Sequence, residues 1–98
     1  MMKAVAMRAD AAETLALRAL AWVAADEVLL ARLVAETGID AAEMRARADE
    51  PEFLGFVLDF LLADEAALLG FCASEDIPPE LPGQARVVLP GGDLPSWT

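Results

Sequence analysis

Large apolar residues are most concentrated between residues 51 and 63, where the chain reads PEFLGFVLDFLLA. Placed on a helix at about 100° per residue, the large apolar side chains of this segment cover an arc of roughly 240°. Only Glu52, Gly55 and Asp59 share the remaining stripe. Because a helix of this kind must be covered on several sides, the pattern predicts that residues 51–63 form the central helix of a small bundle.

The remainder of the chain alternates amphipathic segments with residues that start or stop helices. Asp26 and Asp64 each precede an apolar-periodic segment and are expected to be N-caps, and Gly38 suits the left-handed position after a helix. Asp10 and Asp40 each stand three residues before a glutamate, which is the spacing of a capping box. These signals together predict helices at about 10–25, 26–37, 40–48, 51–63, 64–76 and 80–89.

The chain also contains an internal repeat, because residues 20–39 align without gaps on residues 58–77. Identical pairs in this alignment are Leu20/Leu58, Ala25/Ala63, Asp26/Asp64, Glu27/Glu65, Leu30/Leu68, Ala35/Ala73 and Ile39/Ile77. A unit of this length cannot bury its apolar face alone, so two such units are expected to stack.

These patterns predict an all-α fold, a small bundle of five to six short helices built from two similar three-helix units. The units are expected at about 10–48 and 49–89, and together they make a single helical domain over residues 10–89. The first helix and the helix at 51–63 are expected to pack as equivalents at its centre. Residues 1–9 are predicted to be a flexible leader and residues 90–98 a flexible tail.

Composition narrows the classes of function. Seventeen acidic against seven basic residues give a net charge of −10, which disfavours binding to nucleic acid or to anionic membranes. The single cysteine excludes an intramolecular disulfide and fits a reducing compartment. No secretory signal or membrane-spanning segment is evident. A cytoplasmic protein with no nucleic-acid or membrane partner is therefore expected.

Carboxylates provide the most plausible metal-binding site. The Asp26–Glu27 and Asp64–Glu65 corners could form a quasi-symmetric cluster for Mg²⁺ or Ca²⁺, because both ions prefer oxygen ligands. The favoured interpretation is structural: each Asp caps a helix, and each Glu benefits from the helix dipole in the first turn. A carboxylate-based, metal-dependent enzyme remains the alternative.

Residues for other chemistry are scarce. The chain has no His and no Tyr, so Cys72 has no histidine to act as its base, and it aligns with Val34 on a core face. Neither a phosphate-binding glycine loop nor a paired-cysteine metal motif is present. No catalytic residue and no cofactor is therefore predicted.

Three arginines suggest a second alternative function, binding to nucleic acid. Arg45 and Arg47, with Arg32, could form the basic edge of a helix-turn-helix, which keeps a weak nucleic-acid binder among the alternatives. Trp97 stands in the Pro/Gly-containing tail, as a partner anchor or as part of an inert segment.

Apolar residues beside the predicted inward faces are candidates for an interaction surface. Helices at 10–25 and 51–63 both have apolar side chains on two sides, and a small bundle need not cover them all. The candidates are Leu17, Leu20, Leu54, Leu58 and Leu62. They predict a non-catalytic protein-interaction or regulatory module with an unidentified protein partner, and the acidic exterior suits a basic partner. A homodimer and a monomer stay open as alternatives.

Several segments resemble a known family. AETLALRALAW at 12–22, ADE at 25–27, TGID at 37–40 and the stretch from Phe53-Leu54 to Phe71-Cys72 are similar to a family of small helical proteins of unknown function in alphaproteobacteria. The resemblance covers about residues 10–90. It implies an all-helical domain without an assigned activity, and it supplies no catalytic residues.

Overall fold

The computed structural model describes residues 7–90, and within them the chain forms six helices and no strand. The predicted all-α fold is confirmed. The helices are α1 (Ala9–Ala24), α2 (Glu27–Thr37), α3 (Ala41–Ala46), α4 (Pro51–Leu62), α5 (Glu65–Glu75) and α6 (Leu81–Val88). Most of the predicted leader and tail, at 1–6 and 91–98, lies outside the described residues, as does Trp97.

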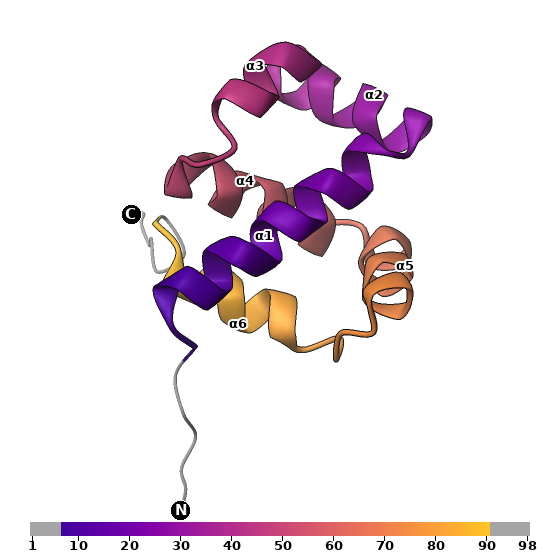
Figure 1. The fold of residues 1–98 in the computed structure, drawn as a ribbon. Helices are drawn as coiled ribbons and strands as arrows, with labels where there is room; N and C mark the ends of the chain where they lie inside the picture. The colour runs from indigo at the N-terminus through magenta and orange to yellow at the C-terminus, as the bar shows by residue number, and fades with distance from the viewer. Residues whose placement is uncertain (1–6, 91–98) are drawn as a thin grey trace, which may run out of the picture.

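Helices α1 and α4 cross at the centre of the molecule, and α1 also packs against α2 and α6. In Figure 1, α1 runs diagonally across the view with α2 and α3 above it, α6 below it and α4 behind it. Helix α6 packs closely against both α1 and α4, and α5 packs against α4. Helix α3 has no comparably extensive contact with any other helix of the described chain.

The core is centred on α4, as its sequence predicted. Seven of its twelve residues are buried: Phe53, Leu54, Gly55, Val57, Leu58, Phe60 and Leu61. Leu33 from α2 and Phe71 from α5 are fully buried in the same cluster. Burying a side chain of this size stabilises the fold by about 1.5–3 kcal/mol.

Three of the four predicted caps are confirmed. The Asp26 Oδ1 accepts hydrogen bonds from the N–H groups of Val28 and Leu29, both at 3.0 Å. Asp40 accepts the Glu43 N–H at 2.8 Å, and Asp64 caps α5.

The predicted capping box at Asp10 is wrong. Helix α1 begins at Ala9, after Arg8 in the N-cap position, so Asp10 is already the second helical residue. Its carboxylate accepts the adjacent Ala11 N–H at 2.9 Å. The acid still lies in the first turn, where the helix dipole favours it, but it does not cap the helix.

The second helices of the two halves, α2 and α5, begin and end at the predicted offset of 38 residues. Helix α2 spans 27–37 and α5 spans 65–75, and both are preceded by an aspartate N-cap. Each is followed by a left-handed residue, Gly38 with φ 75° and Asp76 with φ 58°. The third helices differ, because α6 packs closely on the core and α3 does not. Superposition of the two complete units stays a prediction.

Candidate functional site

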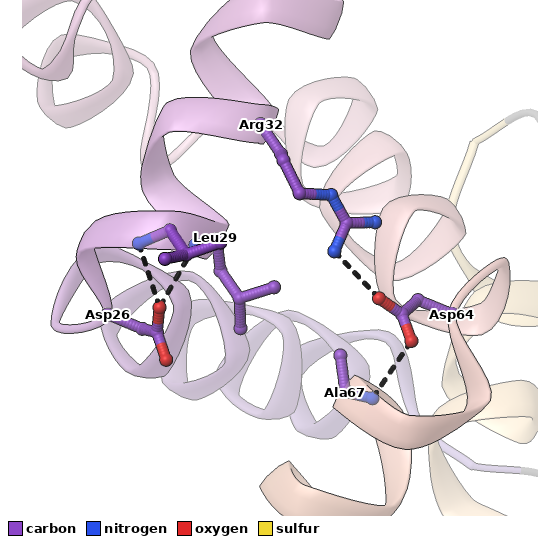
Figure 2. A network of polar contacts seen from close by, with 6 residues as sticks. Asp26, Leu29, Arg32, Asp64 and Ala67 are labelled. Carbon is purple, nitrogen blue, oxygen red and sulfur yellow. Dashed lines mark hydrogen bonds and ion pairs between the residues drawn. The ribbon is translucent and has the colours of Figure 1, made fainter.

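Asp26 and Asp64, the aspartates of the two acidic corners, accept hydrogen bonds from the start of their own helices, and Asp64 also pairs with Arg32 (Figure 2). Asp64 accepts the Ala67 N–H at 3.1 Å and a hydrogen bond from Arg32 Nη1 at 2.8 Å. The Arg32 guanidinium, followed by the Ala67 N–H, lowers the pKa of the Asp64 carboxyl below its ordinary value. Asp26 caps α2 without an ion pair to any described residue. The cap interpretation of both aspartates is therefore confirmed.

These corners do not assemble into a metal centre in the structure. Glu27 and Glu65 are exposed in the first turns of α2 and α5. Over residues 7–90, no group of three or more His, Cys, Asp or Glu residues is placed so that it could hold a metal ion. The metal-dependent alternative has no geometric support in this part of the chain.

The three arginines have separate surroundings. Arg32 forms the ion pair with Asp64, and its guanidinium carbon lies 5.4 Å from the centroid of the Phe60 ring. Arg47 donates a hydrogen bond from its Nε to Glu43 at 3.2 Å, four residues earlier in the chain. Arg45 borders an apolar groove, described below. Carboxylates thus partly neutralise the predicted basic edge.

The Cys72 thiol is buried in α5. Burial, followed by the negative charge of Glu80, raises the pKa of this thiol. The thiolate is the nucleophilic form, so both effects oppose nucleophilic chemistry at Cys72. The structure therefore agrees with the predicted core position.

The five leucines proposed for interaction divide between core and surface. Leu54 and Leu58 are 2% and 0% exposed, because α1, α5 and α6 all pack against α4. Leu20 is also buried. All three correct the expectation that they are exposed, although Leu20 and Leu54, at 7% and 2% exposure, form part of the walls of surface hollows. Leu17 and Leu62 are exposed on the surface.

Leu17 borders a groove between α1 and α3, which we call the α1–α3 groove. One part has a volume of about 270 Å³ and is predominantly apolar. Its lining comprises Leu17, Leu20, Ala21 and Ala24 from α1, Leu30 from α2, and Ala41, Met44, Arg45 and Ala48 from α3 and the turn that follows it.

A second hollow of about 480 Å³ continues the groove toward the start of α1. It shares Leu17, Arg45 and Ala48 with the first part. Its additional polar residues include Asp10, Glu13 and Asp49. The groove therefore has an apolar part and an acidic end.

The groove exists because α3 does not close over this face of α1. Met44 is the buried anchor of α3, while Ala41 and Arg45 on either side of it remain exposed. The α1 wall consists largely of small side chains, such as Ala21 and Ala24. Leu17 was predicted from the sequence as an interaction residue, whereas these alanines were not. Leu17, Ala21 and Ala24 follow one another at helical spacing, which was the signal available for a second apolar face.

When the alignment of the repeat is extended toward the N-terminus, the positions on α4 that correspond to Leu17 and Ala21 are Gly55 and Asp59. This face of α4 is closed by Arg86 of α6, which donates hydrogen bonds to the Asp59 carboxylate at 2.6 and 3.0 Å. Arg86 also donates a bond to the Pro90 carbonyl oxygen at 3.0 Å. A Cβ on Gly55 would lie only 2.9 Å from Arg86 Nη1. Gly55 shares this face of α4 with Asp59, as the sequence pattern predicted, but it is buried there.

Comparison with known proteins gives one match. A family model with the description "Protein of unknown function (DUF3572)" matches residues 9–92. No curated protein and no solved structure matches the chain. No helix within the described residues is both long enough and apolar enough to cross a membrane.

Proposed function

The chain belongs to the DUF3572 family of unknown function, and we propose that it is a non-catalytic protein-interaction module that binds its partner through the α1–α3 groove. The exposed Leu17 side chain within the groove is the observation that carries this proposal. We also propose that the protein is cytoplasmic and that its family occurs in alphaproteobacteria, as the resemblance suggests.

Apolar grooves bordered by polar groups are typical of surfaces that bind proteins or small ligands. Leu17 is 46% exposed although it lies in the middle of α1, one of the two central helices. A partner that covers Leu17 gains the free energy of burying apolar area on a wall that is already ordered. The alanines beside it allow a partner backbone to approach α1 closely.

Two matched variants test the proposal. Leu17→Asp places a charge in the groove, whereas Leu69→Asp makes the same change at an equally exposed leucine of α5, outside the groove. The tagged wild-type chain should recover a specific protein from native lysate. Leu17→Asp should lose that protein and Leu69→Asp should retain it. Equal recovery by both variants, or loss with Leu69→Asp alone, contradicts the proposal.

The other interpretations have their own measurements. A homodimer predicts that the mass in sedimentation equilibrium at micromolar concentration exceeds the 10.4 kDa of one chain. If the protein is a metal-dependent enzyme, Mg²⁺ or Ca²⁺ should raise the melting temperature of the wild type and should not raise that of Asp26→Ala. A nucleic-acid binder predicts complex formation at physiological salt that Arg45→Ala weakens. On the present proposal, neither added metal nor nucleic acid has an effect.

A further inference from the structure

We infer that the ligand of the α1–α3 groove is a single amphipathic helix of a partner protein, with its basic residues over Asp10, Glu13 and Asp49. This inference rests on the proposed function and adds the form, charge and direction of the bound segment. Two independent features of the structure support it: the way in which α6 binds the corresponding face of α4, and the distribution of charge along the groove.

Helix α6 provides an example of such binding within the molecule. It packs against both α1 and α4, more extensively against α1, and brings an arginine to the face of α4 at Gly55 and Asp59. The side chain of this arginine, Arg86, is only 13% exposed. The face of α1 at Leu17 and Ala21 corresponds to this position, but no third helix closes it within the described chain. A helix supplied by a partner would therefore cover Leu17 and Ala21 on α1 as α6, through Arg86, covers Gly55 on α4.

The shape of the groove suits a helix laid along it. Helices α1 and α3 form its two walls, and the shared residues Leu17, Arg45 and Ala48 connect its two parts. Helix-in-groove recognition uses apolar side chains at spacings of three and four residues, which lie on one helix face. Such a face would contact Leu17 and the alanines of α1.

Charge gives the bound helix its direction. The end of the groove near the start of α1 has three carboxylates, Asp10, Glu13 and Asp49, against one arginine, Arg45. Arg8 pairs with Asp10 at the surface, with side chains that are 83% and 74% exposed, and offsets part of its charge, so Glu13 and Asp49 carry most of the negative charge at this end. Lys or Arg residues of a partner are favoured at this end, and acidic residues are disfavoured.

The same charges argue against two other occupants. A second copy of the chain has a net charge of −10 and would bring a predominantly acidic surface to an acidic end. Residues 91–98 of the chain itself contain the apolar Leu94 and Trp97, but Asp93 is their only charged side chain. Neither occupant offers a cluster of bases. A basic helix from a different protein fits the groove better than either.

Selection from a random peptide library displayed on phage tests the inference with the full chain as bait. The library would display peptides of about 16 residues, which is long enough for four helical turns. Peptides would be selected on the wild type and counter-selected on Leu17→Asp, with Leu69→Asp as a positive control. We expect enriched peptides with apolar residues at helical spacing and Lys or Arg clustered at one end. Double substitution Glu13→Gln and Asp49→Asn should weaken the enriched peptides about two- to ten-fold and reduce the salt dependence of binding.

The possible outcomes separate this inference from the proposed function. Groove-dependent peptides without basic residues, or with affinity unchanged in the double variant, would overturn the inference and leave the interaction module standing. Enrichment that is equal on wild type and Leu17→Asp would overturn both. Peptide binding that increases after deletion of residues 91–98 would identify the chain's own tail as the occupant. Dimerisation lost in Leu17→Asp would identify a second copy, and either result overturns the inference.

Discussion

On α4, Gly55 is buried beneath Arg86 of α6, which pairs with the half-exposed Asp59, whereas the corresponding face of α1, at Leu17 and Ala21, borders an open groove beside α3. The second helices, α2 and α5, have the same length and the same aspartate N-cap in the two halves. The difference arises in the third helix. Helix α6 brings Arg86 onto the core, while six-residue α3 is anchored chiefly by Met44. Similar helical frameworks can therefore leave one face closed and the other available for binding.

A second difference lies where the two halves meet. Arg32 of α2 lies over the Phe60 ring of α4. In the repeat alignment, Gly70 corresponds to Arg32 and Trp22 corresponds to Phe60. Two indole atoms of Trp22 lie 3.4 Å from the point that a Cβ on Gly70 would occupy. The larger ring thus faces the residue without a side chain, and the smaller ring faces the arginine. The two pairs fill equivalent places with side chains of different sizes.

The largest expected effects test whether both halves contribute to one core. Leu33 and Phe71 occupy corresponding positions and are both 0% exposed. Leu33→Ala should lower the free energy of unfolding by about 2–5 kcal/mol, and Phe71→Ala by about 3–5 kcal/mol. Urea denaturation followed by circular dichroism measures both. The usual cost of such a truncation is higher than about 1 kcal/mol. A smaller loss for Leu33→Ala would show that α2, and not only α3, is loosely packed in the first half, which would contradict a core shared equally by the two halves.

The next effect concerns the closed face. Arg86→Met removes the hydrogen bonds to Asp59 and to the Pro90 carbonyl, while it retains much of the apolar stem. We expect a loss of about 1–3 kcal/mol in the free energy of unfolding, because bonds to charged groups are the stronger class. Arg8→Met is the matched control at an exposed ion pair and should change stability by less than about 0.5 kcal/mol. Similar losses for the two variants would mean that Arg86 does not close this face.

The Asp64 cap should make the stability of the fold depend on pH. Asp26→Ala should cost about 0.5–2 kcal/mol at neutral pH, and Asp64→Ala should also lower the melting temperature. The pKa of Asp64 is lowered in the folded state by Arg32, so its contribution is present above the unfolded value of about 3.9 and is lost as pH falls through the folded value. Melting curves from pH 7 to pH 2 should therefore show a weaker acid dependence in Asp64→Asn. An unchanged acid dependence in that variant would contradict the role of the ion pair.

The smallest effect compares two helical glycines. Gly70→Ala should raise the free energy of unfolding by about 0.5–1 kcal/mol, because the new Cβ makes an ordinary contact with Trp22 and alanine favours the helix. Gly55→Ala should instead be destabilising, because its Cβ would crowd Arg86 and lie 3.1 Å from the Pro90 carbonyl oxygen. Thermal melts of the two variants should shift in opposite directions. A gain in both would show that Arg86 can move aside without cost.

Short sequence patterns were sufficient to predict most of the helices and their ends. The caps at Asp26, Asp40 and Asp64 depend on atoms within three residues, so short sequence patterns predicted them. The left-handed Asp76 was not anticipated, although its alignment with Gly38 provided the signal. The Asp10 cap failed because the helix starts earlier than the capping pattern implied.

Contacts between segments that are distant in the sequence could not be predicted from short sequence patterns. Asp59 is the only charged residue in the second half of α4, so its sequence context indicates that it pairs with a base. Nothing nearby in the sequence shows that this base is Arg86, 27 residues later. Leu17, Leu54 and Leu58 are all leucines beside an inward face. Which of them is buried depends on how α3 and α6 pack, and periodicity within one helix does not contain that information. The groove could therefore be identified only from the structure.

Native-state hydrogen exchange of the free chain, resolved by residue with NMR, tests most directly whether one face is open and the other closed. Amides in and just after α3, such as Met44 and Arg47, are hydrogen-bonded to the helix, as are Gln84 and Leu89 in and after α6. We expect the α3 amides to exchange about 10- to 100-fold faster than those of α6, because α3 lacks extensive packing and opens locally. Equal protection of the two helices, at the level of global unfolding, would contradict an open face beside α3.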